Sequence, residues 1–414
     1  VVPLISRRYY LTRVLTACCC CACRYTDKKF PATADSLGAV RGDAAFASKI
    51  VWKRGDEIAK SGKMKLFSGK IEPTDIGQGQ LGDCWLLSAF ACLAEHPGAI
   101  ATVFKTKYRS RRGKYVVNLY DSTQGRWFAV TVDDQIPVDA TSGEPVFARP
   151  NGDELWVLIL EKAFAKFVGS YHALEGGHTV WALQVLTGDN VMRVKFNATS
   201  STWERWDMVP DPAVKRKIGL RSAGESFTKE TFFEMLQKYD KMNSVMGAST
   251  SGADDSKLSR GIVTGHAYSV LKVVDVSHFF SRTKFRMVCL RNPWGQNGEW
   301  DGDWSDASPL WQQHEDVRKA CNPDLSAGTS DGVFWMSYDD FCIHFSCVDI
   351  CHRTTGLKDL NLDIHEDDGC IGPFKGCCLG CLGYWCLCRG CRGLCCGVES
   401  SDKTVKTGCC SCCP

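Results

Sequence analysis

Apolar and polar residues alternate differently in the two halves of the chain. Residues 115–120 and 127–132 alternate with the period of two expected of strands, and a polar segment joins them, which predicts an antiparallel hairpin. Between residues 155 and 167 the apolar residues recur at helical spacing among good helix formers. Gly169 follows them, so this segment is predicted to form a helix that ends there.

The second half of the chain has one further helical pattern and is otherwise rich in strands. Residues 228–239 form an amphipathic helical pattern, and residues 245–350 contain repeated β-branched runs, one of which spans 285–290. Helices and hairpins followed by a mainly antiparallel sheet predict an α+β fold.

The composition is that of an ordinary globular protein. The chain has 414 residues, of which 44% are hydrophobic and 23% charged, so it is long enough for two domains with separate cores. The formal net charge of +3 gives no electrostatic reason to expect a nucleic acid as partner. No apolar stretch reaches the roughly 18 residues that would predict a membrane-spanning helix.

Cysteine is the residue whose distribution is unusual. Of 25 cysteines, five lie within residues 18–23 and thirteen between Cys370 and Cys413, which leaves seven for the long middle of the chain. A secreted, disulfide-stabilised fold would distribute its cysteines through the folded region. The cysteine-poor middle therefore predicts a reducing compartment, and we expect a cytoplasmic protein.

The most informative chemical feature is a single thiol in front of an apolar helical segment. Cys84 precedes the run Trp85–Ala94, and three glycines make the approach to it irregular. A cysteine at a helix N-terminus lies at the positive end of the helix dipole, which favours the thiolate. Gln78 is close enough along the chain for its amide to face an oxyanion formed at this thiol. The alternative is that Cys84 is a small core residue.

Two further segments supply the partners that a thiol nucleophile needs. His266 precedes an apolar, β-branched strand, and Asn292 follows the strand at 285–290. Cysteine, histidine and asparagine in this order form the triad of papain-like peptidases, in which the asparagine fixes the imidazole tautomer that faces the thiol. Each residue alone is weak evidence, but together they predict a cysteine peptidase.

The three motifs resemble the active-site signatures of the calpain family. They read Gln78-Gly-Gln-Leu-Gly-Asp-Cys-Trp-Leu-Leu, Gly265-His-Ala-Tyr-Ser-Val and Arg291-Asn-Pro-Trp-Gly. The long separation between the cysteine and the histidine is also similar to calpains rather than to papain. Other similar segments extend the resemblance over residues 28–352.

The resemblance implies a papain-like core of two lobes with the active site between them. The first lobe, with the nucleophile, is expected at residues 28–178, and the second, with the histidine and asparagine, at residues 179–352. Residues 1–27 are then a cysteine-containing N-terminal extension. Residues 353–414 are an acidic linker and a cysteine-rich tail.

The resemblance also implies a role for each active-site residue. Cys84 would attack the peptide carbonyl, His266 would take and return its proton, and Asn292 would orient the imidazole. Gln78 and the backbone N–H of the nucleophile would stabilise the oxyanion. The residues expected to shield the His–Asn pair or to admit a substrate strand are Gly177, Gly265 and Trp294.

Calpain cores bind calcium without helix–loop–helix modules, and the resemblance implies two sites. Asp75 and Glu154 match the side-chain ligands of the first site, with backbone carbonyls near residues 68 and 70. The carboxylates that match the second site are Glu299, Asp306 and Asp331. Oxygen ligands drawn from distant segments suit calcium. The alternative is that they are ordinary surface acids.

The second site departs from the family pattern. Val333 stands where the family has a glutamate ligand, and Pro73 stands where it has the arginine that pairs with that glutamate. Because both partners are missing, neither leaves an unpaired buried charge, but the site has one ligand fewer. We therefore expect calcium dependence chiefly through the first site, and no organic cofactor.

These observations predict a calcium-dependent intracellular cysteine endopeptidase that cleaves protein substrates and needs no small regulatory subunit. The alternative is a catalytically weak or inactive calpain-like scaffold or calcium sensor at a membrane. All four catalytic positions are present, whereas an inactive relative normally lacks at least one.

The cysteine-rich tail has three interpretations. Clustered thiols beside leucine, tryptophan and arginine favour reversible palmitoylation, which would hold the protein at a membrane surface. Zinc would use Cys-x₂-Cys pairs, which occur at 378–381 and 388–391, but many near-equivalent thiols surround them. The third interpretation is a tail of biased composition that binds neither.

If the tail is acylated, hydroxylamine, which cleaves thioesters, should release the protein from membranes of its native cell. Each chain contributes roughly 0.8 kcal/mol per buried methylene, so two or more chains anchor stably where one does not. Replacing residues 370–413 should also release the protein without loss of peptidase activity. Cytosolic protein with free tail thiols, or protein with stoichiometric zinc, would contradict acylation.

Overall fold

The computed structural model describes residues 24–352, apart from 40–43, 63, 211–217, 253–257, 278–283, 294–297 and 326–331. Both cysteine-rich ends therefore lie outside the described residues, as do Trp294 and Asp331. No helix in the described part of the chain is both long enough and apolar enough to cross a membrane.

The first half of the described chain consists of helices, short 3₁₀ turns and two-stranded sheets. In chain order its elements are α2 (Ala34–Leu37), α3 (Ala44–Ala47), β1 (Ile50–Arg54), α4 (Gly55–Ile58), η3 (Pro73–Asp75), β2 (Ile76–Gly77), α5 (Cys84–Ala94), α6 (Ala99–Val103), β3 (Lys114–Asp121), β4 (Arg126–Asp133), β5 (Gln135–Asp139), β6 (Arg149–Pro150), α7 (Trp156–Val168), η4 (His172–Leu174) and α8 (Thr179–Thr187). The strands pair as β1–β5, β2–β6 and β3–β4.

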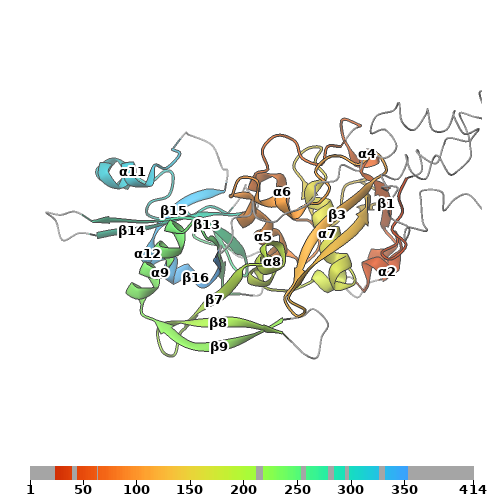
Figure 1. Ribbon diagram of the computed structural model, residues 1–414. Helices are drawn as coiled ribbons and strands as arrows, with labels where there is room; N and C mark the ends of the chain where they lie inside the picture. The colour runs from red at the N-terminus through yellow and green to blue at the C-terminus, as the bar shows by residue number, and fades with distance from the viewer. Residues whose placement is uncertain are drawn as a thin grey trace, which may run out of the picture.

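The second half is built on one large antiparallel sheet, whose strand order is β15-β14-β13-β10-β16-β7-β8-β9. Its elements are β7 (Asn190–Asn197), β8 (Thr202–Pro210), β9 (Ile218–Phe227), α9 (Lys229–Lys241), β10 (Val245–Thr250), β11 (Leu258–Ser259), β12 (Ile262–Val263), β13 (Ala267–Ser277), β14 (Lys284–Arg291), α10 (Leu310–Gln313), α11 (Glu315–Cys321), β15 (Val333–Ser337), α12 (Tyr338–His344) and β16 (Phe345–His352). Figure 1 shows this sheet on one side of the molecule and α5, α7 and β3 on the other.

The structure confirms the α+β class and the elements predicted from periodicity. The predicted hairpin is β3–β4, with Val117 opposite Val130. Helix α7 ends at Gly169, which adopts a positive φ of 125° that a residue without a Cβ tolerates. Helix α9 begins after Thr228, whose side chain accepts a hydrogen bond from Thr231 N and so caps the helix.

Two large hydrophobic clusters form the core, and α5 and α8 belong to the first of them. The first surrounds α5 and α7, and the second lies between the large sheet and α9 and α12. Helix α8 directly follows residue 178, yet it buries Leu183 and Leu186 in the first cluster. The division of the chain into lobes at residue 178 remains a prediction.

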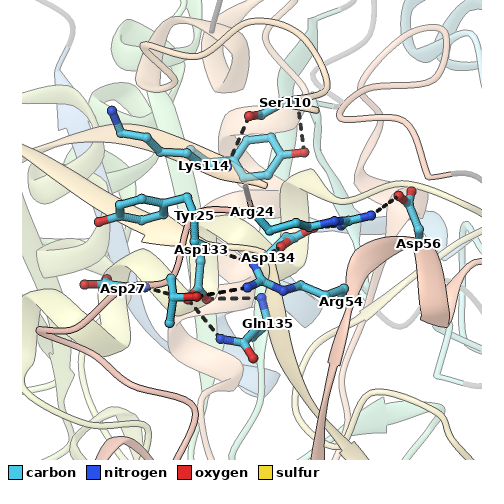
Figure 2. Close-up of polar contacts among 12 residues, drawn as sticks. Arg24, Tyr25, Asp27, Arg54, Asp56, Ser110, Lys114, Asp133, Asp134 and Gln135 are labelled. Carbon is cyan, nitrogen blue, oxygen red and sulfur yellow. Dashed lines mark hydrogen bonds and ion pairs between the residues drawn. The ribbon is translucent and has the colours of Figure 1, made fainter. Parts of the chain in front are cut away.

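A network of ion pairs fixes the segment that enters the fold at residue 24 (Figure 2). Arg54 Nη1 lies 2.6 Å from Asp134 Oδ1, and Arg24 contacts both Asp134, at 3.4 Å, and Asp56, at 3.2 Å. Arg109 also pairs with Asp56. Because these residues come from four separate segments, the network ties the entry segment to the β4–β5 turn.

Asp133 is the most buried member of this region. Its carboxylate accepts from Asp27 N at 2.7 Å, and it pairs with Lys162 Nζ of α7 at 2.5 Å, with neither side chain exposed. Burial alone would raise the pKa of Asp133, but the Lys162 ammonium and these hydrogen bonds lower it. The pair joins α7 to the end of β4.

Asp133→Asn should lower the free energy of unfolding by about 3–5 kcal/mol, because it leaves the Lys162 ammonium buried without a carboxylate. Urea denaturation would measure this loss. The matched control is Glu225→Ala, which removes the half-exposed partner of Arg205 and should cost less than about 1 kcal/mol. Equal losses in both variants would contradict a special role for the buried pair.

Candidate active site

Helix α5 begins at Cys84, and every residue after it in this helix is buried. The thiol-bearing residue itself is only partly buried, so the helix presents it at the edge of the core. Trp85 fixes this end of the helix: its indole nitrogen donates to Leu174 O at 2.8 Å, and its ring stacks on Trp181 at 5.4 Å between centroids.

The loop before Cys84 is fixed by close backbone contacts. Gln80 N donates to Val146 O at 2.8 Å. A Cβ on Gly79 would lie 1.9 Å from Phe147 O, so only glycine fits at this position. The side-chain amide of Gln78 donates to Leu81 O at 3.3 Å, which directs it along the loop that leads to the cysteine.

His266 is buried at the start of β13, and Thr250 at the end of β10 holds its backbone. His266 N donates to Thr250 Oγ1 at 3.0 Å, and Thr250 N donates to His266 O at 3.0 Å. The Thr250 hydroxyl in turn donates to Val263 O at 2.8 Å. Tyr268 packs edge-on against the imidazole at 5.2 Å between centroids. Thr250 thus fixes the backbone of His266, and Tyr268 contacts its ring.

The structure brings His266 and Asn292 together. Asn292 Oδ1 lies 3.0 Å from His266 Nε2, and each residue is only 1% exposed. Because Nε2 is engaged by the asparagine, Nδ1 is the ring nitrogen suited to exchange a proton with a thiol. Helix α5 packs against β10 and β13, so the helix that begins at Cys84 lies beside the strand that follows the histidine.

Asn292 is itself held by two backbone groups that the motif analysis missed. Its Nδ2 donates to Gly298 O at 3.1 Å, and its backbone N donates to Gly332 O at 2.8 Å. A Cβ on Gly298 would lie 2.4 Å from Asn292 Nδ2. The sequence signal for this contact is the turn-forming pair Asn297-Gly298, which follows the motif closely.

The two glycines expected near a substrate have local reasons for being glycine. A Cβ on Gly177 would lie 2.4 Å from the indole of Trp85, so this glycine lets the tryptophan pack. Gly265 has a φ of 64°, in the left-handed region that favours glycine. Their contact with substrate stays a prediction. Trp294, the third residue of that group, is outside the described part of the chain.

The carboxylates predicted for the first calcium site lie close to each other. Asp75 and Glu154 interact electrostatically, and Glu154 Oε1 accepts from Ser68 N at 3.0 Å. Glu154 Oε2 is buried and accepts no hydrogen bond of normal geometry among the described residues, although the Trp156 indole lies close enough to both carboxyl groups to oppose in part the rise that burial causes in their pKa. Burial, and then the charge of Asp75, raise the pKa of Glu154 to about 7. Burial also raises the pKa of Asp75. A buried carboxylate oxygen without a donor fits a cation.

The second calcium site has less support. Glu299 Oε1 accepts from Gly332 N at 2.7 Å, Asp306 is partly buried, and Asp331 lies outside the described residues. Within the described ranges, no group of three or more His, Cys, Asp or Glu side chains could hold a metal ion. Val333, at the position where the resemblance implies a glutamate ligand, pairs in β15 with Arg291 of β14.

Comparisons with known proteins agree with these motifs. Residues 25–352 match the family model described as calpain family cysteine protease. The chain is 36% identical over 338 residues to the calpain-type cysteine protease DEK1 of Arabidopsis thaliana, which covers 79% of this chain and 14% of that protein. It is 38% identical over 335 residues to the calpain-type cysteine protease ADL1 of rice, Oryza sativa subsp. japonica, again covering 79% and 14%.

An animal relative matches this chain at a lower identity but over a larger share of its own length. The chain is 31% identical over 369 residues to human calpain-9, which covers 86% of this chain and 47% of that protein. The chain therefore spans less than half the length of these relatives. The family match over residues 25–352 includes Cys84, His266 and Asn292, and on this basis the chain belongs to the calpain family of cysteine proteases.

Proposed function

We propose that this chain is a cysteine endopeptidase in which Cys84, His266 and Asn292 form the catalytic triad. The buried contact of 3.0 Å between His266 Nε2 and Asn292 Oδ1 carries this proposal. A buried histidine that meets an amide oxygen through one nitrogen is oriented for proton transfer through the other. The partly exposed thiol at the start of α5 supplies the nucleophile.

In the proposed reaction His266 Nδ1 takes the proton of Cys84 as the sulfur attacks the peptide carbonyl carbon. The oxyanion that forms accepts hydrogen bonds from the Gln78 amide and the backbone N–H of Cys84. The imidazolium then gives its proton to the leaving amine. Water, deprotonated by the same imidazole, attacks the thioester and releases the second product. Asn292 holds the ring tautomer through all of these steps.

The substrates we propose are proteins, bound in a papain-like arrangement between the α5 side and the large-sheet side of the molecule. Support comes from the packing of α5 against β10 and β13, which joins the two sides at the proposed triad. An intracellular location is also proposed. None of the seven cysteines in the described ranges forms a disulfide, which accords with a reducing compartment.

Calcium is the proposed cofactor, held first by Asp75 and Glu154. The support is the buried, donor-free Oε2 of Glu154 and the raised pKa values of both carboxyl groups. When bound, calcium would supply positive charge that offsets two neighbouring carboxylates. Asp75 ends the turn from which the chain continues through β2 to Gln78, so its position bears directly on the oxyanion side of the site.

Cys84→Ala and His266→Ala should each abolish hydrolysis of casein, because nucleophile and base act as a unit whose losses do not add. Asn292→Ala should retain measurable activity, since the imidazole still adopts the required tautomer part of the time.

The matched control is Cys92→Ala on the same helix. Burial raises the pKa of the Cys92 thiol to about 12, so this thiol is not a nucleophile and its loss should leave hydrolysis intact. Casein hydrolysis by purified Cys84→Ala at the wild-type rate would refute the triad and favour a different function, such as a scaffold.

Asp75→Asn and Glu154→Gln should each raise the calcium concentration needed for half-maximal activity by about tenfold or more, because each removes a charged ligand. Asp306→Asn should have a smaller effect, since its site already lacks the glutamate replaced by Val333. Titration of activity against buffered calcium would measure this order. Full activity in excess chelator would refute calcium dependence.

A further inference from the structure

Asp83, the residue directly before the proposed nucleophile, does not use its side chain as an aspartate at this position normally does. It is the N-cap of α5, where an aspartate usually accepts from the backbone N–H groups of the first turn, yet it makes no side-chain cap. Leu86 N and Leu87 N are bonded instead to its backbone carbonyl, at 2.8 and 3.1 Å. The carboxyl group is therefore directed elsewhere.

The carboxyl group of Asp83 meets that of Glu161 in the core. Asp83 is 0% exposed and Glu161 is 2% exposed. Among the described residues, no other side chain and no backbone N–H of a neighbouring residue donates to the side-chain oxygens of Asp83, and the Glu161 carboxyl group is the group that lies near enough to interact with them. Ionised carboxylates only accept hydrogen bonds, so a contact between two of them requires a proton on one.

In the described part of the chain, no cation contacts the pair that would let both groups ionise. Lys162, the next residue of α7, pairs with Asp133 at 2.5 Å and is balanced by it. The other titratable group that faces the pair is Tyr171, which burial keeps neutral by raising its pKa well above the usual value. Burial raises the pKa of Asp83, and burial together with the Asp83 charge raises that of Glu161.

The contacts of Glu161 indicate where the proton lies. Its Oε1 accepts from Ala148 N at 2.7 Å, a bond that suits an oxygen without a proton. The other oxygen, Oε2, is then the atom available to carry a proton. Ala148 follows Phe147, whose carbonyl oxygen packs against Gly79 in the loop before Cys84. Through Ala148, Glu161 therefore contacts the segment that supports this loop.

We propose that Asp83 and Glu161 share a proton at neutral pH and that this carboxyl pair positions Cys84 by joining the start of α5 to α7 and to the 147–148 segment. The inference rests on the proposed role of Cys84 as nucleophile. The pair touches no substrate and is a positioning pair, not a catalytic one. Losing its remaining proton would place two like charges in contact and push the start of α5 away from α7.

Kinetics of casein-derived peptide hydrolysis distinguish this role from a general packing role. Glu161→Ala should lower kcat/KM by up to about a hundredfold, mainly through kcat, because a shift of roughly 1 Å at the nucleophile has that effect. The kcat/KM of Glu161→Gln should be at least about tenfold higher than that of Glu161→Ala, since the glutamine amide can donate to Asp83 and accept from Ala148 N. If the Gln variant is as impaired as the Ala variant, the shared proton is refuted.

The pH profile gives a second readout that packing alone would not change. The folded protein holds the shared proton more tightly than the unfolded chain. The contribution of this proton to the stability of the folded site is therefore present at low and neutral pH, and it is lost as pH rises through the raised pKa of the folded state. Glu161→Gln has no such proton to lose, so its kcat/KM should decline at higher pH than that of wild type. Identical alkaline limbs in both proteins would refute the proposal.

Infrared spectroscopy tests the proton without any assay of activity. The difference between wild type and Glu161→Gln at neutral pH should contain the carbonyl stretch of a protonated carboxyl group. The matched control is Asp56→Asn. Burial opposes ionisation of Asp56, but its hydrogen bonds to Arg109 and Arg24 lower its pKa, so Asp56 is ionised at neutral pH. The difference between wild type and Asp56→Asn should therefore lack the band of a protonated carboxyl group. Absence of the band from the Glu161→Gln difference would overturn the proposal, whereas activity in Cys84→Ala would overturn the proposed nucleophile and leave the band in place.

Discussion

Burial of α5 is the constraint on which the rest of the site depends. Ten of the 11 residues in this helix are buried, from Trp85 to Ala94, and only the first has access to the surface. The helix cannot slide or rotate without exposing apolar side chains or overpacking the clusters around it. Cys92 Sγ lies only 3.3 Å from where a Cβ on Gly247 would be, so β10 approaches closely as well. The position of Cys84 is therefore a consequence of core packing.

The opposite side of the site depends on hydrogen bonds rather than on apolar packing. His266 and Asn292 are polar and almost fully buried, which is unfavourable unless their polar groups have partners. Thr250, Gly298 and Gly332 supply these partners through a hydroxyl and two carbonyls. These bonds, together with the contact of His266 Nε2 with Asn292 Oδ1 at 3.0 Å, restrict the orientation of the imidazole. A helix fixed by its core thus meets a ring fixed by hydrogen bonds.

The sequence was sufficient for the fold class and for the identity of the candidate residues, because both depend on local information. Periodicity identifies β3, β4, α7 and α9, and motifs identify the triad candidates. The contacts that support those candidates join segments far apart in the chain, and no pattern of spacing reports them. Gly177 shows the limit: its contact with substrate remains a prediction, and no pattern in the sequence reports that the Trp85 ring lies 2.4 Å from where its Cβ would be.

Five carboxyl groups in the first half of the chain are compensated in different ways: Asp133, the pair Asp75 and Glu154, and the pair Asp83 and Glu161. Asp133 has a lysine in contact, its pKa is lowered, and its role is to hold segments together. Among the described residues, no ion pair is formed by Asp75, Glu154, Asp83 or Glu161, and burial raises the pKa of all four carboxyl groups, although Arg291 and Lys65 oppose this for Asp75 and Glu154. A donor-free oxygen on Glu154 accords with an external cation, whereas the contact between Asp83 and Glu161 is satisfied by a proton. The compensating charge is a lysine for Asp133, and we propose calcium for Asp75 with Glu154 and a proton for Asp83 with Glu161.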